Sequence, residues 1–180
     1  MASYAALLRG IMPSNPAMPN ARLRGVFEGL GRQDVRSVLA SGNIVFRTEP
    51  TPVPELEAAI QQALRTELDI PGGTVVREGG VLRALLDRRP FGDLRHQRGT
   101  YLTVTFLKRP PDSAPLPDEP DPLTRVVGYD AEAGAFLAVV DNSDPRRTPD
   151  FMGWLQRTWG EEITTRTWLT VQRIVAKLDG

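Results

Sequence analysis

Two short runs in this sequence carry apolar side chains on both faces of a β-strand, and this feature constrains the fold more than any other. In the run SYAALL, which starts at residue 3, Tyr4 and Ala6 would point to one side and Ala5 and Leu7 to the other. The run NIVFR, from residue 43, has the same character. Such strands need cover on both faces, and helices can cover only one of them. We therefore expect the second half of the chain, or another subunit, to cover the other face.

The first half of the chain has the strand and helix signals of a β-α-β-β-α-β unit, the ferredoxin-like pattern. Asn20 can cap the first helix and Gly31 can end it, because apolar residues recur between them at helical spacing. Gly25 and Gly29 weaken this helix, and we expect them to permit close packing against the sheet. The expected strands are residues 3–8, 34–40, 43–47 and 74–78, and the expected helices are residues 20–30 and 54–68.

The second half repeats this pattern at an offset of roughly 95 residues, which indicates an ancient duplication. Its expected strands are residues 100–107, 123–130, 134–140 and 162–165; its expected helices are residues 149–159, capped by Thr148, and 168–178. Where the first helix of the repeat should lie, the chain reads PPDSAPLPDEPDP, and six prolines in residues 110–122 forbid a regular helix. We expect a mobile surface loop there, with a proline-rich motif for a partner protein as the alternative.

The predicted fold class is therefore α+β, with two ferredoxin-like units, the second degenerate, packed as one compact protein with a C-terminal helix. The first unit is expected in residues 1–80, a helical linker in residues 81–99 and the second unit in residues 100–180. We treat them as one integrated domain, because the two-faced strands need cover that one unit does not supply.

Composition excludes several kinds of function. Lys and Arg together number 22, as do Asp and Glu, and this balance argues against broad nucleic-acid binding, which needs a basic field. The absence of cysteine excludes thiol catalysis and thiolate metal sites, and the one histidine, His96, is expected to be solvated surface. We expect no metal and no cofactor. No apolar run has membrane-spanning length, so we expect a cytoplasmic protein that does not enter a membrane.

Three motifs in order, LLRGI near the start, SGNIVF at residue 41 and TTRTWLTV at residue 164, resemble an uncharacterised bacterial family, domain-of-unknown-function family 1697. The resemblance covers essentially the whole chain. It implies a small α+β protein with ferredoxin-like units and no agreed activity, substrate or cofactor. The chain departs from the family pattern at Met12 and Thr167, where the family usually has Asn, and at Arg173, where it usually has Lys. The resemblance therefore implies that any polar site of the family is altered in this chain.

The SGN turn lies where the predicted topology gathers polar groups. In a β-α-β-β-α-β unit, the tip of the hairpin and the end of the first strand share one end of the sheet, which places Ser41, Gly42 and Asn43 beside Arg9 and Gly10. The first helix also starts there. An arginine, a hydroxyl, an amide and a helix N-terminus suit an anion such as phosphate or carboxylate. Two residues of the second half could join this site, Arg166 and Thr170.

A purely structural reading explains the same residues. Gly42 would supply a positive φ angle, Ser41 and Asn43 would bond nearby backbone, and Arg9 would brace the hairpin. The sequence thus leaves the reaction, if any, unknown, since no base or nucleophile is evident. A protein that binds a small anionic ligand, a nucleotide or a carboxylate, is the first hypothesis. The alternatives are a homo-oligomeric interaction protein, such as a homodimer, and an RNA-binding module with Tyr4 and Phe46 exposed on its sheet.

Overall fold

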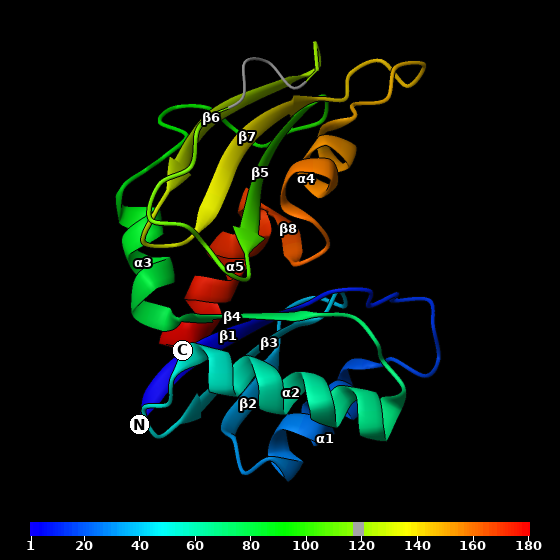
Figure 1. Cartoon of the computed structure of the whole chain (residues 1–180), viewed down its shortest axis with the longest axis vertical. Coiled ribbons are helices and arrows are strands. Elements are labelled where there is room, and N and C mark those ends of the chain that lie inside the picture. Colours follow the sequence, from blue (N-terminus) through cyan, green and yellow to red (C-terminus); the bar gives the residue numbers. More distant parts are fainter. Residues whose placement is uncertain (117–120) are drawn as a thin grey trace. The chain divides into compact units, whose positions relative to one another are not determined.

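Two four-stranded antiparallel sheets form the framework of the protein (Figure 1). The computed structural model describes residues 1–116 and 121–180. Within them the α+β class expected from the sequence is confirmed, with helices beside both sheets and a helix at the C-terminus. By its internal contacts the chain divides into two units. One unit is Met1–Arg83 together with Gln172–Gly180, and the other is Ala84–Val171.

The first unit has the predicted β-α-β-β-α-β order. Its elements are β1 (Ala2–Leu8), α1 (Asn20–Gly29), β2 (Gln33–Ser37), β3 (Asn43–Thr48), α2 (Val53–Leu68) and β4 (Thr74–Glu78), and α3 (Gly79–Asp87) follows directly. The strand order is β2-β3-β1-β4, with every neighbouring pair antiparallel. β1 is therefore a central strand, while β2 and β4 lie at the two edges.

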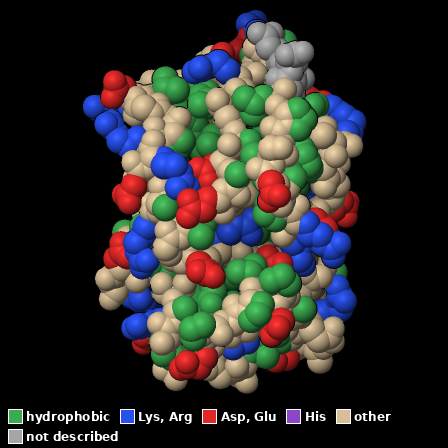
Figure 2. Space-filling model, turned by 60° about the vertical axis from the view of Figure 1, so that its left-hand side comes forward, with side chains coloured by type: hydrophobic (Ala, Val, Ile, Leu, Met, Phe, Trp, Pro, Cys, Tyr) green, Lys and Arg blue, Asp and Glu red, His purple; other side chains and the backbone are tan. Residues whose placement is uncertain are grey.

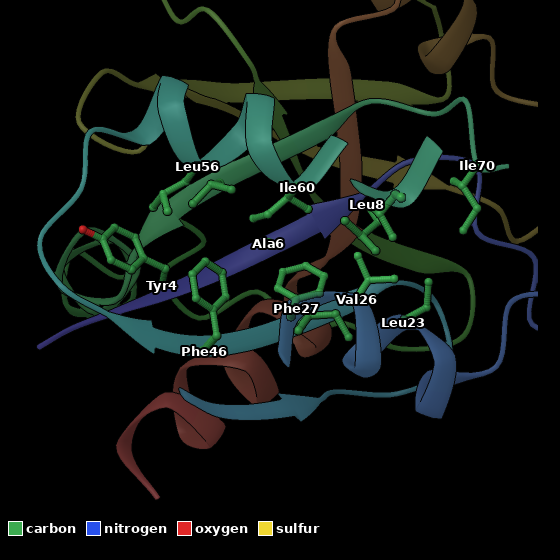
Figure 3. Packing of buried hydrophobic residues seen from close by; sticks show 13 residues of the cluster. Tyr4, Ala6, Leu8, Leu23, Val26, Phe27, Phe46, Leu56, Ile60 and Ile70 are labelled. Carbon is green, nitrogen blue, oxygen red and sulfur yellow. The ribbon is translucent and has the colours of Figure 1, made fainter. Parts of the chain in front are cut away.

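The core of the first unit lies between this sheet and the helices α1 and α2 (Figure 3). Tyr4 and Ala6 point from β1 into this layer, as the alternation of the sequence predicts, and Phe27 reaches it from α1. The ring of Tyr4 stacks on that of Phe46, with centroids 5.6 Å apart. Both rings are buried, with exposed fractions of 2% and 1%. Neither ring is therefore available to stack on a nucleic-acid base.

The second unit repeats this strand arrangement with one helix fewer in its described part. Its elements are β5 (Thr100–Leu107), β6 (Thr124–Asp130), β7 (Ala135–Asp141), α4 (Phe151–Trp159), β8 (Ile163–Thr167) and α5 (Trp168–Asp179), the last of which ends among the residues of the first unit. The sheet order β6-β7-β5-β8 places these strands where the first sheet has β2, β3, β1 and β4. Residues 110–116 form no helix, as their prolines predict, and residues 117–120 of the predicted loop lie outside the described residues.

Details of the helix termini differ from the sequence predictions. α1 begins at Asn20 with Pro19 as its N-cap, and the amide Nδ2 of Asn20 donates to the carbonyl of Leu39 at 2.8 Å. The predicted cap at Asn20 is therefore wrong, because a hairpin carbonyl takes its side chain. α4 begins at Phe151 rather than at residue 149, with Asp150 as its N-cap in place of Thr148.

Gly25 and Gly29 do not serve close packing, which corrects the sequence expectation. Both are exposed, and a Cβ added at either position meets no atom within 4 Å. Glycine in an exposed helix carries an entropic cost relative to alanine that no contact offsets here.

We predict that Gly25→Ala and Gly29→Ala each raise the free energy of unfolding by about 0.5–1 kcal/mol, because alanine restricts the unfolded chain and fits the helix. Urea unfolding followed by circular dichroism measures the change. A loss of stability in either variant would mean that the space beside α1 is occupied.

Candidate functional site

The structure brings the end of β1 and the SGN turn together, as the topology argument predicts. Leu7 is paired with Asn43, and the N–H of Leu8 donates to the carbonyl of Gly42 at 2.8 Å. Arg9 follows at once, and its N–H donates to the carbonyl of Gly73 at 2.9 Å. Gly10 is next to it, exposed and with a φ angle of 76°.

Hydrogen bonds within the hairpin occupy the side chain of Asn43. It is buried, and its Nδ2 donates to the carbonyl of Val38 and to the hydroxyl of Ser41, both at 3.0 Å. Gly42 has a φ angle of 77°, and a Cβ added there would lie 2.6 Å from a side-chain carbon of Ile11. These contacts give Gly42 and Asn43 structural roles in the turn.

Arg166 and Thr170 belong to the second unit. Nη1 of Arg166 donates to the hydroxyl of Thr164 at 2.7 Å and to the carbonyl of Thr165 at 3.0 Å. Burial lowers the pKa of the Arg166 guanidinium to about 10, because a charge loses hydration there. Thr170 donates its backbone N–H to the hydroxyl of Thr167 at 3.3 Å, so Thr167 supports the first turn of α5.

Arg166 has a counterpart in the first unit that the sequence analysis missed. Arg77 of β4 pairs with Ala5 of β1, and Arg166 of β8 pairs with Val104 of β5. Each is the last residue but one of its strand, and each strand continues directly into a helix. Nη1 of each arginine also donates to the carbonyl of the preceding residue, at 2.8 Å for Arg77 and 3.0 Å for Arg166. The signal was present in the sequence, since VVRE and TTRT stand at matching places of the repeat.

A basic pocket at the free edge of β2 was also missed. It has a volume of about 210 Å³ and is lined by Arg24, Val35, Arg36, Ser37 and Lys177, all within the first unit. Arg24 reaches it from α1 and donates to the hydroxyl of Ser37 at 2.8 Å. Nε of Arg36 is buried and has no hydrogen-bond partner among the described residues. None of the lining residues is acidic.

Side chains from both faces of the first sheet meet at this basic pocket. Ser37 is paired with Ile44, whose side chain lies in the core beneath the helices. Arg36 is the neighbouring residue and is paired with Val45, so its side chain leaves the sheet on the opposite face. Because β2 is an edge strand, the side chains of Ser37 and Arg36 can both reach its free edge, which no further strand covers.

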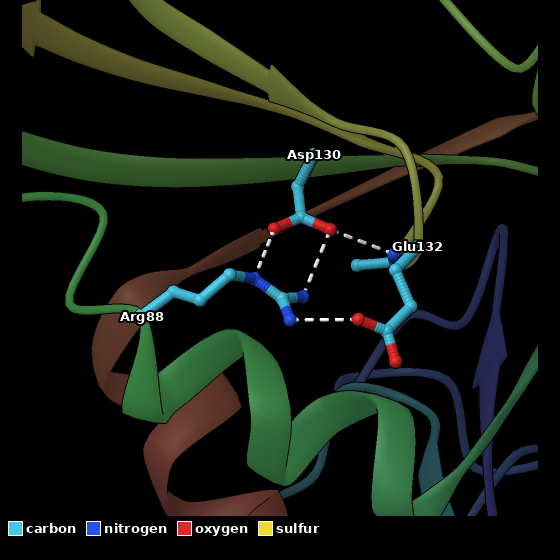
Figure 4. A network of polar contacts seen from close by, with 4 residues as sticks. Arg88, Asp130 and Glu132 are labelled. Atoms are coloured by element: carbon cyan, nitrogen blue, oxygen red, sulfur yellow. Dashed lines mark hydrogen bonds and ion pairs between the residues drawn. The ribbon is translucent and has the colours of Figure 1, made fainter.

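Arg88 and His96 have hydrogen-bond partners within the protein. Arg88 holds the turn between β6 and β7, with Nε and Nη2 donating to Asp130 at 2.7 and 3.0 Å and Nη1 donating to Glu132 at 2.7 Å (Figure 4). The hydrogen bonds to Asp130 raise the pKa of Arg88 above its usual value. His96 accepts the N–H of Leu102 at Nδ1, at 3.1 Å, and stacks on Tyr101. We assign both residues structural roles.

The described residues contain no group of three or more His, Asp or Glu side chains placed to hold a metal ion. No helix in residues 1–116 and 121–180 is long and apolar enough to cross a membrane.

Comparison with known proteins adds a family and a fold. The family model described as "Protein of unknown function (DUF1697)" matches residues 1–122, a span that includes LLRGI and SGNIVF and ends before TTRTWLTV. The structure is similar to that of the conserved bacterial protein SP0830 from Streptococcus pneumoniae, with a TM-score of 0.72 and 20% sequence identity over 100% of this chain and 99% of that one. At this identity the likeness shows the fold alone. No curated protein matches the chain.

We predict that Gly42→Ala lowers the free energy of unfolding by about 2–4 kcal/mol, because the added methyl group is strained at positive φ and collides with Ile11. Gly10→Ala is the matched control. It has nearly the same φ angle but no atom within 4 Å of the added Cβ, so its cost should be the backbone strain of about 1 kcal/mol alone. Chemical denaturation of both variants compares them; equal losses would mean that the turn tolerates the methyl group.

Burial of the Arg166 charge should cost stability at neutral pH. Its folded-state pKa of about 10 lies below the usual value of an arginine in the unfolded chain, so the penalty is fully present below about pH 10 and fades above it. We predict that Arg166→Met raises the free energy of unfolding by about 1–3 kcal/mol at neutral pH. Arg173→Met, on the exposed side of α5, should change it by less than about 0.5 kcal/mol. A less stable Arg166→Met variant would show that the hydrogen bonds of Arg166 outweigh its burial.

Proposed function

The chain belongs to the DUF1697 family of proteins of unknown function, and we propose that it binds a small anion, of the phosphate or carboxylate class, at the basic pocket beside β2. One observation carries the proposal: Arg24, Arg36 and Lys177 line a single pocket that has no acidic side chain in its wall. Like charges brought together repel one another, and an anion between them converts this repulsion into attraction.

The chemistry of the pocket suits an anion with several oxygen atoms. Nε of Arg36 is a buried donor without a partner among the described residues, and a bound oxygen would satisfy it. Guanidinium groups bind phosphate and carboxylate through paired hydrogen bonds, and the ammonium group of Lys177 would add a mobile charge. The volume of about 210 Å³ is smaller than usual sites for drug-sized ligands, which favours a phosphate or small carboxylate group over an enclosed nucleotide.

The SGN turn supports this proposal indirectly. β2 leads into the turn, and the N–H of Val38 donates to the carbonyl of Asn43 at 2.8 Å just beyond Ser37. A turn fixed by Asn43 and Gly42 therefore fixes the strand that carries Arg36 and Ser37. In this proposal Ser41 and Asn43 position the anion site rather than touch the ligand.

Basic side chains at an edge strand have a second use, since they prevent pairing with the strands of other molecules. Edge protection alone predicts no specific gain of stability with an anion. The RNA-binding alternative loses its main support, because Tyr4 and Phe46 are buried. Acidic and basic side chains are also interspersed over the face drawn in Figure 2. The homo-oligomer alternative stays a prediction, which light scattering can check.

The test is thermal unfolding in increasing phosphate, sulfate or citrate, with ionic strength held constant by potassium chloride. A ligand that binds only the folded protein stabilises it by about 2.7 kcal/mol at a hundred times its dissociation constant. We predict that Arg36→Gln and Lys177→Gln each weaken the effect by about tenfold in concentration or more, because a charge-assisted hydrogen bond is lost.

Arg22→Gln and Arg173→Gln are the matched controls. They remove the same charge from exposed positions on α1 and α5 that do not line the pocket. The controls should respond to the anion as the wild type does. The pocket variants should keep their stability without anion, or gain a few tenths of a kcal/mol, because like-charge repulsion is relieved. An equal loss of response in controls and pocket variants would reduce the effect to net charge and contradict the proposal.

A further inference from the structure

A second pocket, in the second unit, has a mixed lining of charges. Its volume is about 530 Å³, within the range of small-molecule sites. Three segments form it: the chain just before β5, the start of β6 and the end of β7. Arg98 and Arg125 line it, and so do Asp121 and Asp141. Neither arginine forms an ion pair in the described part of the chain.

Two residues that line this pocket each have a side-chain oxygen that is buried without a hydrogen-bond partner among the described residues. These atoms are Oδ2 of Asp121 and the hydroxyl oxygen of Thr124. The other carboxylate oxygen of Asp121 accepts the N–H of Leu123 at 2.7 Å, so the residue is held in place by one oxygen while the second has no donor. Buried polar groups are nearly always satisfied, and such an exception calls for a missing donor.

An ammonium group is the donor that fits these atoms best. It carries three N–H bonds and a positive charge, so it can satisfy the carboxylate oxygen of Asp121 and the hydroxyl of Thr124 together. The carboxylate of Asp141 adds negative charge to the same pocket and is itself fixed by Ser143, whose N–H and hydroxyl donate to it at 2.9 and 2.6 Å.

Arg98 and Arg125 are exposed and bring positive charge to the same pocket. A purely cationic ligand would be repelled by these guanidinium groups, and a purely anionic one by Asp121 and Asp141, whereas a ligand with both charges can use all four. We propose that this pocket binds a small zwitterion, with its ammonium group at Asp121 and Thr124 and its carboxylate at Arg98 and Arg125. A free amino acid or a short peptide with unblocked ends has this chemistry. The site shares no residue with the basic pocket of the first unit.

Isothermal titration with alanine, alanylalanine and two blocked dipeptides tests the ligand class. N-acetyl-alanylalanine lacks the ammonium group, and alanylalanine amide lacks the carboxylate. We expect saturable binding of alanine or alanylalanine, and the stronger of the two distinguishes the amino acid from the peptide. Each blocked form should bind about tenfold more weakly or worse, because one charged end loses its partner. No saturable binding at about 10 mM, or equal binding of the acetylated form, overturns the proposal.

Two variants assign the site. Asp121→Asn keeps the shape of the side chain and removes its charge, and Arg125→Gln removes the opposite charge. Each should weaken binding of the unblocked ligand by about tenfold or more. Asp112→Asn and Arg95→Gln make the same charge changes at exposed positions outside the pocket and should bind as the wild type does. Unchanged binding by Asp121→Asn, or an equal loss in the controls, overturns the assignment.

The same preparations also separate this inference from the proposed function. The Asp121→Asn variant should retain the phosphate response of the wild type, because Arg36 and Lys177 lie in the other unit. That response shows in addition that the variant is folded. A failure of phosphate binding in all proteins, with zwitterion binding intact, would contradict the proposed function and leave this inference standing.

Discussion

The pairing of β1 with a strand on each side is the interaction on which the first unit depends. β1 bonds to β3 and to β4, and its side chains are buried on both faces, so it can lie only in the centre of the sheet. Its central position leaves β2 and β4 as edges. β5 has the same place in the second sheet. Neither central strand carries a charged side chain, although β5 holds two threonines whose hydroxyls are hydrogen-bonded within the sheet.

Charge at the edges of the first sheet follows a pattern of register. Arg36 is paired with Val45, Val45 with Ala5, and Ala5 with Arg77, so one row crosses the sheet with an arginine at each edge and apolar residues between them. The middle of the row is apolar, and Arg77 at one end is itself buried, with Nη1 donating to the carbonyl of Val76 at 2.8 Å. The same row in the second sheet runs from Arg166 through Val104 and Leu137 to Gly128, so the two sheets share the arginine only at the edges formed by β4 and β8. An arginine kept at one equivalent edge is what a duplication followed by divergence would leave.

The periodicity of apolar residues was sufficient to predict the strands and helices, because it reflects which side chains each element buries. Topology then brought Arg9 and the SGN turn to the same end of the sheet. The cap at Asn20 was wrong because a distant group, the carbonyl of Leu39, takes its side chain. The cap at Thr148 was wrong because α4 begins only at Phe151. The basic pocket was out of reach for a similar reason. Lys177 and Arg36 both line it, and a contact between residues so far apart in the sequence leaves no local sequence pattern.

The grouping of Gln172–Gly180 with Met1–Arg83 has a consequence for biosynthesis. The first unit is discontinuous, so the ribosome makes most of it early and supplies the remainder only after the whole second unit has been translated. Contacts with such large sequence separation form late and slow the completion of a fold. Lys177 therefore reaches the first unit only after the second unit has been translated. The assembly order of this protein is thus set by its chain path, with the second unit able to finish first.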